Sequence, residues 1–131
     1  MKKRVYHRRR ELERGFAFAQ ATEIRGMVFI SGCLSWDQNG DPVAISNLTE
    51  QVRNVYGELQ SILQELRLSF SDVLKETVFC RSMDGMVAAA EVRAEFLAGH
   101  SPIASTWVEI NRLVNPELLV EIEMIAAREE P

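Results

Sequence analysis

The most reactive side chains in the sequence are two cysteines, Cys33 and Cys80, and two histidines, His7 and His100. Their spacing is not that of a zinc site, so the sequence predicts no metal centre. No histidine lies near Cys33 in the sequence to activate its thiol, which favours a small wall or turn residue over a nucleophile. Two cysteines cannot build a disulfide framework, which fits a cytoplasmic protein.

Carboxylates and a tryptophan near the C-terminus are the other residues that could form a site. Residues 104–110 and 118–127 have the pattern of two strands, joined by a turn at Asn115-Pro116. Because side chains alternate along a strand, each strand divides into two sets, and we assign one set of each to a face without helices. This predicted face carries Ser105, Trp107, Glu109, Leu119, Glu121, Glu123 and Ile125. Its apolar members are costly to expose, at ~25 cal/mol per Å², so we expect it to close against other subunits.

The rest of the chain must position these two strands. Alternating residues predict half-buried strands, and apolar residues at helical spacing predict amphipathic helices. The predicted strands are 16–23, 27–31, 73–80, 104–110 and 118–127, and the predicted helices run from Ser46 or Asn47 to Leu66 and from Met83 or Asp84 to Leu97. The order β-β-α-β-α-β-β predicts an α+β fold, with two helices on one face of a mixed sheet.

Length and charge predict one domain with a basic segment before it. The 131 residues are 47% hydrophobic and include no apolar run long enough to span a membrane. Six of the 15 basic residues lie in the first ten positions, while the whole chain has a net charge of −4. We divide the chain into a basic arm, 1–14, and a single domain, 15–131. The arm could contact phosphates, remain solvated or fold back on the acidic body.

Four segments in a fixed order resemble the Rid (YjgF, reactive-intermediate deaminase) family. They are GFAFAQA at 15–21, MVFISG at 27–32, the helix-plus-strand segment at 48–79 and PELLVEIEMIA at 116–126. The resemblance implies a chorismate-mutase-like fold and a homotrimer with small-molecule clefts at the subunit interfaces. It also implies hydrolysis of enamines or imines without a cofactor.

The resemblance also suggests residue roles. Glu121 falls at the position of the catalytic glutamate that positions water, which is general acid–base work. Gly32, followed by Cys33, falls at the turn that helps to hold the ligand. Phe18 falls at the position of a tyrosine that walls the pocket, and Ala90 at that of a helical asparagine.

The departure with the largest chemical consequence is Ser105, which falls at the position of the arginine that binds the substrate carboxylate. Thr106 follows it, and Trp107 replaces a common cysteine, so all three are candidate substrate-binding residues. A hydrogen bond to a charged group is worth about 1.5–3 kcal/mol, so losing a bidentate arginine should weaken imino-acid binding by roughly one to three orders of magnitude. For Phe18 and Trp107, packing at a subunit interface is an alternative to ligand contact.

Three functions follow from these observations. The first is a Rid-type hydrolase with an altered substrate, and the second is a non-catalytic trimer that binds a metabolite. The third is an endoribonuclease, which the net charge of −4 and the lack of an RNA-binding motif disfavour. Glu121 favours chemistry, whereas Ser105 disfavours the best-known reaction of the family.

Overall fold

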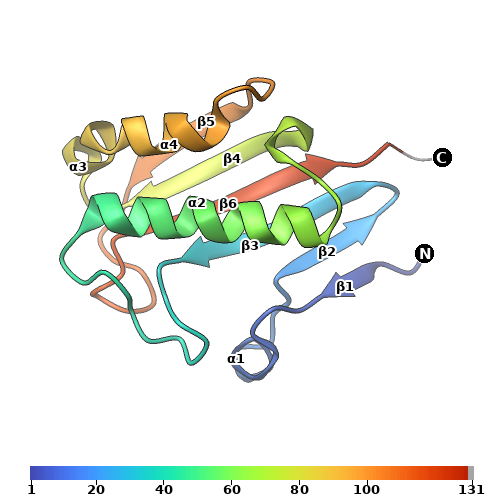
Figure 1. The fold of residues 1–131 in the computed structure, drawn as a ribbon. Helices are drawn as coiled ribbons and strands as arrows, with labels where there is room; N and C mark the ends of the chain where they lie inside the picture. Colours follow the sequence, from blue (N-terminus) through green and yellow to red (C-terminus); the bar gives the residue numbers. More distant parts are fainter. Residues whose placement is uncertain (130–131) are drawn as a thin grey trace.

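A six-stranded sheet with helices over one face forms the fold of this computed structural model, which describes residues 1–129 (Figure 1). The strands lie in the order β1-β2-β3-β6-β4-β5. β4 and β5 are parallel and the other neighbouring strands are antiparallel, which confirms the predicted mixed sheet and α+β class. The elements are β1 Arg4–Tyr6, α1 Arg10–Gly15, β2 Ala21–Ile24, β3 Met27–Leu34, α2 Leu48–Glu65, the 3-10 helix Phe70–Asp72, β4 Val73–Cys80, α3 Met83–Ala88, α4 Ala90–Leu97, β5 Ala104–Glu109 and β6 Val120–Ala127.

The core lies between the sheet and its helices. α2 begins where its capping signal predicts, because the Asn47 side chain accepts a hydrogen bond from the N–H of Glu50 at 3.0 Å. Within the part of the chain described, no helix is long and apolar enough to cross a membrane. The buried apolar stripe of α2 is Val52, Val55, Tyr56, Leu59, Ile62 and Leu63.

The first predicted strand is much shorter than the sequence pattern indicates. Residues 16–23 alternate, but β2 begins only at Ala21. α1 ends just before Phe16, and Ala17 has a φ of 58°, in the left-handed region that a strand does not contain. Phe18 therefore lies in a loop rather than in a strand.

The second predicted helix is divided at Ala89 into α3 and α4. The N–H of Val92 donates to the carbonyl oxygen of Ala89, three residues back, which gives a tighter turn than that of an α-helix. α3 begins at its predicted position, where the Ser82 side chain caps the N–H of Gly85 at 3.0 Å. Arg93 of α4 points toward the sheet, where its Nε donates a hydrogen bond to Glu76 of β4.

The basic N-terminal segment contributes one strand and several ion pairs. β1 pairs antiparallel with β2 and forms one edge of the sheet. Arg9 donates to Glu58 at 2.5 Å, and Arg8 contacts both Glu58 at 2.8 Å and Glu65 at 3.2 Å. These two arginines thus lie against acidic residues of α2.

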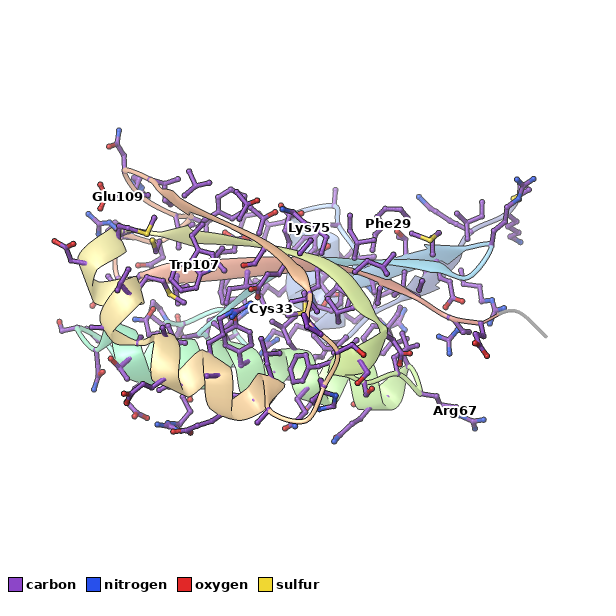
Figure 2. All side chains as sticks on the ribbon, turned by 90° about the horizontal axis from the view of Figure 1, so that it is seen from above. Phe29, Cys33, Arg67, Lys75, Trp107 and Glu109 are labelled. Carbon is purple, nitrogen blue, oxygen red and sulfur yellow. The ribbon has the colours of Figure 1, made fainter. Side chains whose placement is uncertain are left out.

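The sequence analysis assigned Ser105 and Trp107 of β5 to the helix-free face, and this assignment is wrong. Ser105 pairs with Glu76, which is fully buried and hydrogen-bonded to Tyr56 of α2, so this side of β5 faces the helices. Figure 2 shows Trp107 between the sheet and the helices and Lys75 on the other side. Thr106 accepts a hydrogen bond from Lys75, which places it on the helix-free face. Alternation separates the two sets of side chains, but it does not tell which set contacts the helices.

The helix-free face is partly apolar even without Trp107. Phe29 and Val108 are exposed on it, at 45% and 39% of their surface. Strand pairing aligns Phe29 with Ile125 and Phe79 with Val108, which joins these four into apolar pairs. The polar residues of this face include Thr22, Lys75, Thr77, Thr106, Glu121 and Glu123.

Candidate functional site

A cavity of about 350 Å³ brings together three of the predicted site residues, Phe18, Gly32 and Glu121. It lies where the loop before β2 meets the second half of β3 and the start of β6. Glu121 is the one ionisable side chain in its lining. The remaining lining residues are Phe16, Ser31, Leu34, Trp36 and Val114.

Gly32 allows the Glu121 carboxyl group to approach the backbone of β3. A Cβ atom at Gly32 would lie 2.0 Å from Oε1 of Glu121, closer than any real contact. The approach arises at a β-bulge, where Ser31 and Gly32 together oppose the single residue Glu123 of β6. The glycine of the family-like motif is therefore required by the position of a carboxylate.

The surroundings of Glu121 raise the pKa of its carboxyl group. Burial makes the larger contribution, and the negative charge of Glu123 adds to it. A carboxyl with a raised pKa holds a proton at higher pH than an ordinary glutamate, and it is a stronger base once ionised. Both properties suit a group that transfers protons near neutral pH.

Ser31 fixes the loop that carries Phe18 into the cavity. Its hydroxyl donates to the carbonyl oxygen of Ala19 at 2.6 Å, and its N–H donates to that of Gln20 at 2.8 Å. On the other side, the N–H of Phe18 donates to the carbonyl oxygen of Glu13 at 2.9 Å. The Phe18 loop is thus held at both ends, by β3 and by α1.

Cys33 lies outside the cavity, although it follows Gly32 directly. Its side chain is buried on the helix side of the sheet (Figure 2), where its sulfur accepts a hydrogen bond from Gln20 at 3.7 Å. Burial, together with the charge of Glu58, raises the pKa of the thiol far above its usual range. This thiol is therefore not a nucleophile at neutral pH. Within residues 1–129, no three His, Cys, Asp or Glu side chains are grouped to hold a metal ion.

Ser105 belongs to a buried polar cluster built around Glu76. The Glu76 carboxylate is fully buried and accepts hydrogen bonds from the Tyr56 hydroxyl, the Ser105 hydroxyl and Nε of Arg93, each at 2.7 Å. A second nitrogen of the Arg93 guanidinium also contacts this carboxylate. The donors compensate for the cost of burying a charge. The Ser105 hydroxyl is therefore already engaged within the protein.

Trp107 completes this cluster beside α4. Its indole N–H donates to the hydroxyl oxygen of Ser105 at 2.8 Å, and the Arg93 guanidinium lies 5.8 Å from the centre of a Trp107 ring. Although burial acts to lower the pKa of Arg93, hydrogen bonding and the charge of Glu76 outweigh it and raise that pKa. Arg93 is consequently a permanent cation with a fixed position.

The structure thus separates five of the seven predicted site residues into two groups. Phe18, Gly32 and Glu121 line the cavity, whereas Ser105 and Trp107 belong to the Glu76 cluster. Of the other two, Cys33 lies in the core and Thr106 on the helix-free face. The sequence analysis missed Glu76 and Arg93. A signal was present for Glu76, since it shares one face of its strand with Val78 and Cys80, and a charged residue on a buried face requires a partner.

These features first define a class of fold. A two-layer sandwich with this strand order is the YjgF, chorismate-mutase-like fold. The Rid-family protein YyfA of Yersinia pestis superposes with a TM-score of 0.86, covering 97% of this chain and 100% of its own, at 23% identity. A putative endoribonuclease of Thermotoga maritima has a TM-score of 0.76 and 32% identity, covering 86% of this chain and 87% of its own.

The sequence then identifies the family. Residues 9–128 match the family described as Endoribonuclease L-PSP, and the chain belongs to this family, also called YjgF or Rid. The 3-aminoacrylate deaminase RutC of Acinetobacter baylyi is 31% identical over 109 residues, which is 83% of this chain and 85% of that protein. The fold and the family thus agree with the resemblance found in the sequence.

Proposed function

We propose that this protein hydrolyses a small enamine or imine in the cavity of Phe18, Gly32 and Glu121. The observation that carries the proposal is the Glu121 carboxyl group, which lies against Gly32 in a largely apolar cavity and has a raised pKa. The relationship to a 3-aminoacrylate deaminase supports the same class of reaction. The protein would thus remove ammonia from a reactive nitrogen compound.

In the proposed reaction, Glu121 moves protons between water and the substrate. Protonation of an enamine on carbon gives an iminium ion. Glu121 then removes a proton from a water molecule as the water oxygen adds to the iminium carbon, which gives a neutral carbinolamine with a hydroxyl and an amino group on one carbon. Glu121 next transfers this proton to the amino nitrogen, and ammonia leaves as the hydroxyl proton returns to the carboxylate and the C=O bond forms. The sum is one enamine or imine and one water converted to a carbonyl compound and ammonia.

We further propose a substrate without a carboxylate. The Ser105 hydroxyl donates to Glu76, and the Arg93 guanidinium binds the same carboxylate, so neither group is available as an unpaired anchor for an anion. The one ionisable group lining the cavity, Glu121, has the same charge as a substrate carboxylate. A neutral imine with an apolar body suits Phe18 and the neighbouring aromatic side chains better.

We expect the wild-type protein to release ammonia faster from a neutral imine than from the matching imino acid. An amine oxidase acting on an amino-acid amide and an amino-acid oxidase acting on the free amino acid supply the two substrates. The expected ratio of kcat/KM is at least about tenfold, since one charged hydrogen bond is worth about 1.5–3 kcal/mol. Equal or faster turnover of the imino acid would refute the proposed preference, and no turnover of either would favour a non-catalytic metabolite-binding trimer.

We also propose that the active form is a homotrimer whose helix-free faces pack together. Phe29 and Val108 are exposed on that face, and β5 presents an open sheet edge beside it. Light scattering should then give three times the chain mass of 14.9 kDa. Replacing Phe29 with Glu should shift the mass toward the monomer, whereas replacing Val87, which is exposed on α3 in the helix layer, with Glu should not. A monomeric wild type would contradict the proposed assembly.

An endoribonuclease function has less support, although the family carries that description. RNA binding relies on free basic residues that contact phosphates. Arg8 and Arg9 of the basic N-terminal segment are instead paired with Glu58 and Glu65. The net charge of −4 also disfavours binding to RNA, whose phosphates are negatively charged.

A further inference from the structure

A second cavity, of about 490 Å³, lies between β1, β2 and the end of α2. It shares no lining residue with the cavity of Glu121. The half-buried side chains of Tyr6 and Leu66 form an apolar floor, and the buried Ala21 and Val28 lie beneath it. A cavity of this volume is large enough for a small organic molecule.

The rim of this second cavity has an excess of positive charge. Glu23 is bound by Arg128 through two hydrogen bonds, at 3.0 and 3.1 Å. Glu65, the other acidic lining residue, accepts hydrogen bonds from the Tyr6 hydroxyl and from Arg8. The negative charges of Glu23 and Glu65 are therefore balanced by the neighbouring Arg128 and Arg8.

Two lining arginines remain once these pairs are formed. Within residues 1–129, neither Arg4 nor Arg67 forms a salt bridge. Arg4 lies opposite Glu23 in the β1–β2 pair, where the hydrogen bond from Arg128 and, to a smaller extent, the charge of Arg4 lower the pKa of that carboxyl group. A local excess of positive charge thus stands beside an apolar floor, on a chain whose net charge is −4. This combination favours a ligand with one anionic group and an apolar body.

Arg67 has a backbone conformation that would suit glycine better. It follows α2 with a φ of 60°, and the N–H of Leu68 closes the helix end on the carbonyl oxygen of Leu63 at 2.7 Å. Glycine adopts this left-handed conformation without strain, whereas arginine does not. A cation at a helix C-terminus gives some compensation. Figure 2 shows the exposed Arg67 side chain extending outward from the end of α2 at the edge of the molecule, so that ligand binding requires it to turn toward the cavity.

We propose that this second cavity binds a small anion with an apolar body, whose carboxylate or phosphate group lies between Arg4 and Arg67. The apolar part rests on Tyr6 and Leu66. This site is independent of the proposed hydrolase function, because no residue of the Glu121 cavity takes part in it. Strain at Arg67 is then the cost of keeping a cation at the cavity mouth.

Three probes of similar shape test the ligand class on the full-length protein: benzoate, phenyl phosphate and benzamide. Amide chemical shifts in two-dimensional NMR spectra should move for Tyr6, Thr22 and Arg67 and saturate with a dissociation constant in the millimolar range, as ligands of about ten non-hydrogen atoms typically give. Neutral benzamide should bind at least tenfold more weakly. The tighter of the two anions identifies a carboxylate or a phosphate site. The proposal is overturned if neither anion saturates these shifts, or if benzamide binds equally well.

A pair of matched variants separates this binding role from a structural one. Arg67→Gly should weaken anion binding at least tenfold while leaving the unfolding temperature unchanged or higher, because it relieves backbone strain. Arg25→Gly is the control, since Arg25 also has a positive φ, of 50°, and lies outside the cavity lining. It removes the same charge and should leave anion affinity unchanged. Equal losses in both variants would reduce the effect to net charge and refute the site.

Discussion

Glu121→Gln is expected to abolish ammonia release and to stabilise the protein at pH 7. Proton transfer by a positioned side chain contributes about 10²- to 10⁴-fold to rate, and glutamine cannot supply it. The pKa of Glu121 is raised in the folded protein, so folding is favoured while the carboxyl is protonated, and this contribution is lost as pH rises through the folded pKa. At pH 7 the ionised carboxylate is therefore a cost that glutamine removes. Kinetics and thermal unfolding at pH 7 and pH 4 measure both effects.

Two controls distinguish the role of Glu121 from that of charge alone. Glu123→Gln removes a neighbouring negative charge on the same face of β6, and it should retain most activity. Gly32→Ala keeps the charge of Glu121 but displaces its carboxyl group, because the added Cβ would lie 2.0 Å from Oε1. It should lose activity with little loss of stability, since a flexible side chain can move aside. Full activity in Glu121→Gln would remove the residue from the mechanism.

Of the substitutions described, Arg93→Met is expected to cause the largest decrease in the free energy of unfolding. It leaves the Glu76 carboxylate buried without its cation, and breaking a buried ion pair from one side typically costs ~3–5 kcal/mol. Urea unfolding of the wild type and the variant measures the difference. The Tyr56 and Ser105 hydroxyls still donate to Glu76, which keeps the loss at the lower end of that range.

A double variant tests whether the uncompensated charge of Glu76 causes the loss of stability in Arg93→Met. In Glu76→Gln/Arg93→Met the amide oxygen at position 76 accepts a hydrogen bond from one of the Tyr56 and Ser105 hydroxyls, its NH2 group donates to the other hydroxyl oxygen, and the side chain carries no charge. The double variant should therefore regain most of the stability that Arg93→Met loses, and the difference defines the coupling of the pair. If the double variant is as unstable as the single one, packing by Arg93 rather than its charge is responsible.

Much of the fold could be predicted from local sequence because local physics decides it. β4 spans residues 73–80 as predicted, although its pairing with β6 is irregular between Val73 and Lys75, and the start of α2 follows from the capping side chain of Asn47. The alternation of residues 16–20 was misleading, because the end of α1 and the left-handed Ala17 determine the path of the chain there. The alternation of residues along the sequence does not reveal where α1 ends or that Ala17 is left-handed.

The residues of the candidate site could be predicted only in part from the sequence. The resemblance selected Phe18, Gly32 and Glu121, and these residues meet in one cavity, although their catalytic role stays a prediction. It also selected Ser105, whose hydroxyl the structure commits to Glu76. That bond joins residues 29 positions apart in the sequence, on two parallel strands whose register local patterns do not specify.

The sequence by itself thus determined which residues alternate along β5 and β6, where α2 and α3 begin, and which family the chain resembles. Only the tertiary structure decided that Ser105 and Trp107 face the helices, because the buried charge of Glu76 requires the donors of Tyr56, Arg93 and Ser105 around it. Likewise, a bulge in β3 decided that Glu121 lies against Gly32. A strand pattern has two possible faces, and the free energy of distant contacts selects between them.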